Sequence, residues 1–101
     1  MQMTKESDEM HSLVLQIAKA LVDAPDEVSL ELVRKENGSV LRLRVAPEDT
    51  GKVIGKQGRT ARSIRTILAA CSMKYRHHFS LEIIEEHALR ASATAALAEA
   101  G

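Results

Sequence analysis

The sequence predicts an α+β domain in which helices pack on one face of a three-stranded mixed sheet. Three observations lead to this prediction. Two segments repeat apolar residues with the period of an α-helix, three segments alternate apolar and polar residues as half-buried strands do, and a glycine-rich loop separates two helical stretches. With 101 residues, the chain has the length of one domain.

The first predicted element is a helix from Glu9 to Val22, whose apolar residues recur in steps of three and four. Ser7 and Asp8 have side chains that commonly cap helices, and Pro25 in the following loop ends the helix. We expect residues 1–8 to form a flexible terminus. The apolar positions of the helix are Met10, Leu13, Val14, Ile17 and Leu21.

Residues 28–45 predict a β-hairpin, because two alternating runs flank Asn37 and Gly38. Asn-Gly is a strong hairpin signal, since the type I′ turn requires positive φ angles at both of its central residues. The two strands are therefore expected to be antiparallel neighbours. Their apolar positions are Val28, Leu30 and Leu32 in the first strand and Leu41, Leu43 and Val45 in the second.

Two helices separated by a glycine-rich loop follow Pro47, which ends the second strand. A short helical turn from Glu48 to Ile54 leads into residues 55–58 (GKQG), and a longer helix runs from Arg59 to Met73. Three arginines lie on a different arc from the apolar stripe of this helix and are expected to face water. The stripe consists of Ile64, Ile67, Leu68 and Cys71, and the arginines are Arg59, Arg62 and Arg65.

The third predicted strand alternates Phe79, Leu81 and Ile83 with polar residues. Because two helices connect it to the second strand, these two strands are expected to pair in parallel. The folded domain is expected to span residues 9–86. Residues 88–100 contain seven alanines, and we expect residues 87–101 to form a mobile or partly helical tail.

The charges are unevenly distributed, although 14 basic and 14 acidic residues give a net charge of zero. No Asp or Glu lies between Thr50 and Leu81, and this acid-free segment contains seven lysines and arginines. A local excess of positive charge attracts polyanions whatever the total charge of the chain. With one Tyr, one Phe and no Trp, the chain has no row of aromatic platforms on which bases stack.

Several classes of protein are excluded by composition. The single cysteine, Cys71, permits neither an internal disulfide nor a cysteine-rich zinc site, and its place on the apolar stripe indicates a buried thiol. His77 and His78 have no partners at metal-ligand spacing, and Glu48 and Asp49 fit a helix start better than a catalytic pair. We therefore expect no metal, no cofactor and no enzymatic activity.

The N-terminal segment is polar and acidic, so it does not resemble a signal peptide. No apolar run approaches the ~20 residues of a membrane-spanning helix. A cytoplasmic location is the expectation from these two observations.

The loop at residues 55–58 is the segment most informative about function. Glycines allow a tight turn and a close approach of the backbone to a sugar-phosphate chain, and the next helix directs its positive dipole end to the same place. Lys56 and Arg59 add charge, so the loop predicts a phosphate clamp, although an ordinary helix–helix turn is the plainer alternative. A P-loop would need Ser or Thr at Gln57, and a dinucleotide fingerprint would need glycine at Val53.

Residues 53–58 (VIGKQG) resemble the I-G-x-x-G signature of KH domains, and the order of predicted elements resembles the bacterial type II arrangement, α-β-β-α-GxxG-α-β. Residues 21–28 (LVDAPDEV) and 44–60 (RVAPEDTGKVIGKQGRT) are similar to small stand-alone bacterial KH proteins of the KhpA family. The resemblance covers residues ~10–85.

The resemblance implies binding of single-stranded RNA, with the GxxG loop on the backbone of about four nucleotides. It also implies an aliphatic groove for the bases between the flanking helices and a sheet edge, for which Leu30 to Val33 is our suggestion. Ala61 stands where many KH domains have a larger aliphatic residue, which makes the groove floor smaller. The expected RNA-binding residues are Lys52, Val53, Ile54, Gly55, Lys56, Gln57, Gly58, Arg59 and Arg62.

Two roles remain open on these grounds. One is a post-transcriptional regulator or RNA chaperone. The alternative is a protein-interaction module, a homodimer or the partner of a larger KH-containing protein, in which RNA binding is secondary. Leu15 and Val22 lie off the centre of the first helix's apolar stripe and form a candidate dimer surface.

Overall fold

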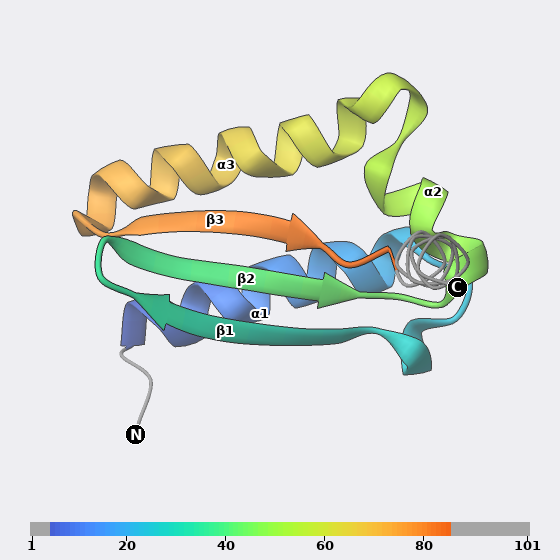
Figure 1. Ribbon diagram of the computed structural model, residues 1–101, viewed down its shortest axis with the longest axis horizontal. Coiled ribbons are helices and arrows are strands. Elements are labelled where there is room, and N and C mark those ends of the chain that lie inside the picture. Colours follow the sequence, from blue (N-terminus) through green and yellow to red (C-terminus); the bar gives the residue numbers. More distant parts are fainter. Residues whose placement is uncertain (1–4, 86–101) are drawn as a thin grey trace, which may run out of the picture.

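The computed structural model describes residues 5–85 and shows an α+β fold with one three-stranded sheet, as predicted (Figure 1). The strand order is β1-β2-β3, with β1 antiparallel and β3 parallel to β2, so both predicted pairings are confirmed. The predictions for residues 1–4 and 87–101 lie outside the described residues. The elements are α1 (Lys5–Leu21), β1 (Ser29–Lys35), β2 (Gly38–Arg44), α2 (Thr50–Ile54), α3 (Arg59–Tyr75) and β3 (His78–Ile83), with short 3-10 turns at Pro25–Glu27, Pro47–Asp49 and Lys56–Gly58.

The helices share one face of the sheet. Figure 1 shows α1 behind the sheet and α3 along the β3 side. Side chains on the covered face are buried, whereas the alternate residues of each strand lie on an uncovered face. The central buried residues are Leu41, Leu43, Phe79 and Leu81 from the strands, Met10, Val14 and Ala18 from α1, Val53 from α2, and Ile64 and Leu68 from α3.

Helix α1 begins at Lys5 in the described chain, earlier than the predicted start at Glu9. Ser7 is buried and continues the stripe of Met10, Val14 and Ala18 by one turn. The acidic Glu6 also lies in the first turn, where a carboxylate complements the helix dipole. The helix is longer than predicted because a small polar residue, which an apolar pattern does not register, also packs on the core.

The predicted hairpin is confirmed, but the predicted type I′ turn at Asn37 and Gly38 is wrong. Glu36 and Asn37 form the turn, and Gly38 already pairs with Lys35 as the first residue of β2. Among non-glycine residues that the structure describes, a positive φ occurs at Gln57 and Arg76 and not at Asn37. Gly38 instead allows β3 to pass close to the start of β2, because a Cβ at position 38 would overlap the carbonyl oxygen of His78.

The apolar stripe of α3 differs from the predicted one at Ile67, which is 44% exposed. The buried positions are Ala61, Ile64 and Leu68, and Cys71 is half-buried rather than enclosed. At 100° per residue, Ile67 lies on the margin of the arc that these residues define. The small side chain of Ala61 extends the buried face in the other direction, towards the start of the helix.

Replacing Leu68 by Ala tests which side chains of α3 belong to the core. The side chain is 1% exposed, so we expect the substitution to lower the free energy of unfolding by about 2–5 kcal/mol through lost burial and a cavity. The matched control is Ile67→Ala, for which we expect a loss below ~1 kcal/mol. Urea denaturation measures both, and equal losses would contradict the assignment of the core face.

Candidate nucleic-acid interface

The GxxG loop is a tight left-handed turn between α2 and α3. Gly55 has φ 80° and ends α2, with its amide donating to the carbonyl of Gly51 at 2.8 Å. Gln57 has φ 56° and Gly58 has φ 73°, and the amide of Gly58 donates to the carbonyl of Gly55 at 3.0 Å. Three residues of the segment therefore adopt a conformation that most side chains disfavour.

The two glycines of the loop have different roles. A Cβ at Gly55 would lie 2.6 Å from the Cβ of Thr60 and overlap its hydroxyl, so Gly55 is required by packing within the loop. A Cβ at Gly58 would have no heavy atom within 4 Å. The space beside Gly58 is therefore open, and an extended sugar-phosphate chain can reach the backbone there.

Exposed cations lie directly around this open space. Lys56, Arg59 and Arg62 are all exposed, and Arg59 donates from Nη2 to Oε1 of Gln57 at 3.2 Å. Lys56 and Arg62 form no side-chain hydrogen bond or ion pair with other residues in 5–85. The structure thus brings the predicted loop residues and these three cations together at the start of α3, whose N-terminus adds a positive dipole end.

The positive charge of Lys52 was expected to be available to a ligand, but in the structure it is paired with two carboxylates. Its Nζ lies 3.2 Å from Oδ1 of Asp49 and 3.2 Å from Oδ2 of Asp23. Hydrogen bonds to Asp49 and Asp23 raise the pKa of Lys52 above its ordinary value. Two carboxylates therefore balance this ammonium, and its contact with the loop that follows α1 is structural.

Asp49 joins the same network instead of capping α2 as expected. Its side chain accepts no capping hydrogen bond, and Oδ2 instead accepts from the amide of Ala24 at 3.0 Å. Burial alone would raise the pKa of Asp49, but hydrogen bonds from the Ala24 amide, Lys52 and the Asp23 amide outweigh burial and lower it. This network could not be predicted from the sequence, because Asp23 and Asp49 are distant along the chain. The spacing of three between Asp49 and Lys52 is the one local signal of it.

The two apolar residues of the expected site have separate environments. Val53 is 0% exposed and belongs to the core, so its side chain is not on the binding surface. Ile54 is half-buried beside the loop and keeps an accessible surface. Ala61 is buried one turn into α3, under the cations of that helix.

The sheet edge next to α3 belongs to β3, so the suggestion of Leu30 to Val33 as the strand side of a groove is wrong. β1 lies at the other edge of the sheet, with β2 between it and β3. Arg65 of α3 reaches the β3 edge and donates from Nη2 to the carbonyl of Leu81 at 3.4 Å. The predicted pairings already put β1 and β3 at opposite edges of the sheet, and the suggestion overlooked that α3 leads directly into β3 and therefore packs at its edge.

Other expectations concern chemistry away from the loop. His77 contacts Oγ of Ser39 through Nε2 at 2.8 Å. No group of three or more His, Cys, Asp or Glu side chains suited to a metal ion occurs among residues 5–85. No helix in the same part of the chain is long and apolar enough to cross a membrane.

Comparison with known proteins identifies one family. The family model described as "KhpA/KhpB, KH domain" matches residues 11–83. A protein of Clostridium acetobutylicum named RNA-binding protein KhpA is 52% identical over 75 residues, which are 74% of this chain and 100% of the relative. Proteins of the same name from Borreliella burgdorferi and Treponema pallidum are 44% and 49% identical, over 80% and 72% of this chain and 99% and 91% of the relatives.

Glycine substitutions test the geometry of the loop. We expect Gly55→Ala to destabilise the domain by about 1–3 kcal/mol, because the new methyl group meets Thr60 and the backbone is left-handed. The control is Gly51→Ala on the exposed side of α2, where a Cβ has no neighbour within 4 Å and a gain of roughly 0.5–1 kcal/mol is expected. Chemical denaturation of both variants measures the difference, and a neutral Gly55→Ala would refute the packing role.

The Asp49 network predicts a specific dependence of stability on pH. Because the pKa of Asp49 is lowered on folding, its contribution is complete above the unfolded value near 3.8 and is lost as pH falls through the folded value. We expect Asp49→Asn to lower Tm by about 5 °C at pH 7, and the gap to the wild type should narrow as the pH falls below 3.8 and through the lowered pKa of Asp49 in the folded protein. Glu48→Gln, an exposed neighbour, is the control, and a gap for Asp49→Asn that does not depend on pH would contradict the account.

Proposed function

The chain belongs to the KhpA/KhpB family of KH domains, and from this premise we propose that it binds single-stranded RNA through its GxxG loop. The observation that supports this proposal best is the open space beside Gly58, bordered by Lys56, Arg59 and Arg62. The relatives are named as RNA-binding proteins, which supports a binding function for this chain.

The loop would hold the RNA backbone by shape and charge. A phosphate can approach the backbone at Gly58 because no side chain stands there, and Lys56, Arg59 and Arg62 supply positive charge around it. KH loops of this kind contact about four nucleotides through their backbone. We therefore propose a footprint of about four nucleotides at the loop, with little dependence on base sequence.

The bases would lie between the loop helices and the free edge of β3. Ile54 offers the accessible apolar surface on the helix side, and Arg65 marks the β3 edge through its contact with Leu81. An aliphatic groove compensates for the scarcity of aromatic residues in the chain. Contacts of this size give weak binding by one domain, so a second copy or a second RNA-binding domain would raise the apparent affinity through effective concentration.

We also propose self-association or pairing with another KH-containing protein as a second function, because apolar side chains remain exposed on α3. Ile67 is 44% and Met73 is 83% exposed. Of the earlier candidate surface, Val22 is buried in the core and is therefore excluded, whereas Leu15 is half-buried and keeps some accessible surface. A role as a cytoplasmic post-transcriptional regulator or RNA chaperone accords with both functions.

The loop proposal is tested by the double substitution Lys56→Asp and Gln57→Asp. Both side chains are exposed, so the fold should survive, while two carboxylates repel phosphate at the proposed clamp. We expect the affinity for a short unstructured RNA to fall by about 10- to 100-fold at moderate salt, with a shallower salt dependence. Fluorescence anisotropy measures binding, and light scattering reports the oligomeric state.

The matched control is Gln16→Asp with Lys19→Asp on the exposed side of α1, which makes the same chemical changes far from the loop in sequence. Its RNA affinity should remain within about twofold of wild type after allowance for the change in net charge. Equal losses in the two variants would mean that overall charge, and not the loop, determines binding. Absence of RNA binding by the wild type would leave protein association as the main function.

A further inference from the structure

The acid-free segment from Thr50 to Leu81 covers more of the molecule than the loop. In the fold it forms α2, the loop, α3 and the first residues of β3, so these consecutive elements contain no carboxylate. Helix α3 has 17 residues and is therefore about 25 Å long. Arg62 and Arg65 are exposed along it, and the chain beyond its last turn carries further positive charge.

The end of the domain opposite the GxxG loop gathers cations from two separate turns. Gly38 pairs with both Lys35 and His78, which places the β1–β2 turn beside the turn between α3 and β3 (Figure 1). Because β2 lies between β1 and β3, the backbones of Lys35 and His78 are two strand spacings apart, about 10 Å. Arg76 precedes His78 by two residues. We name the pair of cations, Lys35 and Arg76, the distal cationic end.

Arg76 has an unusual backbone for a residue with a side chain. It follows α3 with φ 54° and ψ 36°, the left-handed position at a helix end that glycine usually occupies. Its side chain is exposed, as is that of Lys35. Neither side chain forms a hydrogen bond or ion pair with another residue in the described part of the chain. The charge of Arg76 is therefore available to an external anion, at a backbone position that side chains rarely adopt.

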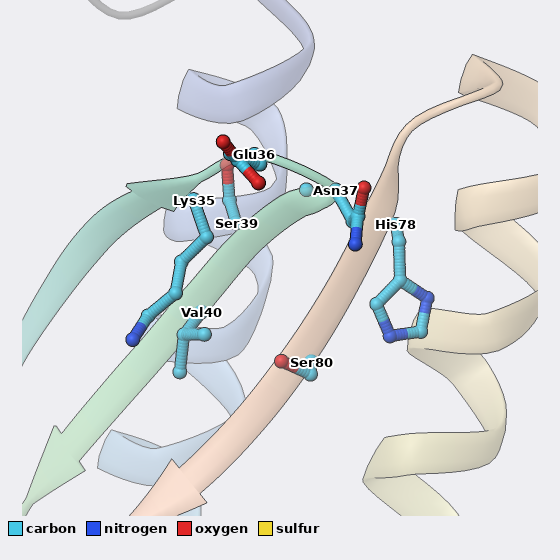
Figure 2. A pocket seen from close by; sticks show the side chains of 8 residues that line it. Lys35, Glu36, Asn37, Ser39, Val40, His78 and Ser80 are labelled. Carbon is cyan, nitrogen blue, oxygen red and sulfur yellow. The ribbon is translucent and has the colours of Figure 1, made fainter.

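A hollow on the uncovered face of the sheet lies at the same end. It has a volume of about 510 Å³ and is lined by Lys35, Asn37, Val40, His78 and Ser80, among others. Figure 2 shows Lys35, Val40 and Ser80 over the strands, with Asn37 and His78 near the turns. An apolar side chain, an imidazole ring, an amide and an ammonium together suit a nucleobase and its phosphate.

Carboxylates near this end lie mainly on the α1 side. Glu6 borders a second, smaller hollow on the helix-covered face, together with Arg34 and Arg76. Glu9 accepts a hydrogen bond from the hydroxyl of Tyr75 at 2.6 Å, and this bond, with burial, raises the pKa of Tyr75 to about 12. Glu36 in the turn is the carboxylate that borders the hollow of Figure 2, and the side chain of Lys35 points away from it along the strands.

We infer that the distal cationic end is a second contact surface for the same RNA strand that the GxxG loop holds. The inference rests on the proposed function. The strand would leave the loop, follow Arg62 and Arg65 along α3, and pass Arg76, which borders the smaller hollow. It would then place a phosphate near Lys35 and a base in the larger hollow of the uncovered face. At a stacked spacing of ~3.4 Å per nucleotide, the ~25 Å of α3 corresponds to about seven nucleotides. RNA of about 12 nucleotides therefore reaches both surfaces, whereas RNA of about four reaches the loop alone.

The experiment compares labelled unstructured RNAs of 4 and 12 nucleotides with the full chain. The distal variant is Lys35→Glu with Arg76→Glu, and its control is Lys19→Glu in the last turn of α1 with Arg44→Glu at the end of β2, which changes the net charge equally at the other end of the strands and of α1. We expect the distal variant to bind the 12-nucleotide RNA about 10-fold more weakly than the control, with a salt slope reduced by about 1.4 for two lost phosphate contacts. Both variants should bind the 4-nucleotide RNA alike. Circular dichroism verifies that each variant is folded, and Arg76→Gln alone gives a milder test.

The outcomes separate this inference from the function on which it rests. If the loop variant Lys56→Asp with Gln57→Asp loses both RNAs while the distal variant matches its control on the longer one, the loop function stands and the distal surface is refuted. If the wild type binds neither RNA, both proposals are overturned. A distal variant that loses the 4-nucleotide RNA equally would also refute the inference, because the effect would not depend on RNA length.

Discussion

The left-handed backbone at Gly55 is the constraint on which the rest of the structure depends. It ends α2 and reverses the chain so that α3 can return along the sheet and deliver β3 parallel to β2. The position admits no side chain, because Thr60 in the first turn of α3 occupies the place of a Cβ. The same reversal leaves Gly58 open to solvent at the start of a helix. The fold and the proposed binding surface therefore depend on the same turn. Its first glycine, Gly55, is required by packing, and its second, Gly58, leaves the backbone accessible to a ligand.

Charge is arranged around this turn in two ways. Lys52 is balanced by Asp23 and Asp49 and joins α2 to the loop after α1, so it stabilises the platform beneath the GxxG loop. Lys56 and Arg62 have no partner among residues 5–85 and remain available. A neutral chain can therefore present a strongly positive surface, because its acidic residues lie in other elements or are paired with the cations that the fold itself uses.

Much of the fold followed from local sequence patterns, whereas contacts between distant segments did not. Alternation and helical periodicity located the three strands and the two long helices of the described chain, and the crossover rule supplied the parallel pairing. The turn at Asn37 was misplaced because glycine is required at position 38 for a different reason. A side chain there would collide with His78 of β3, which lies forty residues later in the sequence. Val53 was assigned to the binding surface through the family resemblance, but it is buried in the core. Lys52 was assigned there for its positive charge, but Asp49 and Asp23 pair with it. Proximity in sequence identified the loop but could not distinguish exposed neighbours from buried ones.

Whether RNA binds at the GxxG loop is tested most directly by titrating the isotopically labelled protein with a short single-stranded RNA and following the amide chemical shifts in NMR spectra. If the loop binds RNA, we expect the largest changes at residues 55–59 and along the exposed side of α3 near Arg62, with small changes in α1 and β1. Changes confined to α1 or β1, with the amides of the GxxG loop unaffected at saturating RNA, would contradict it.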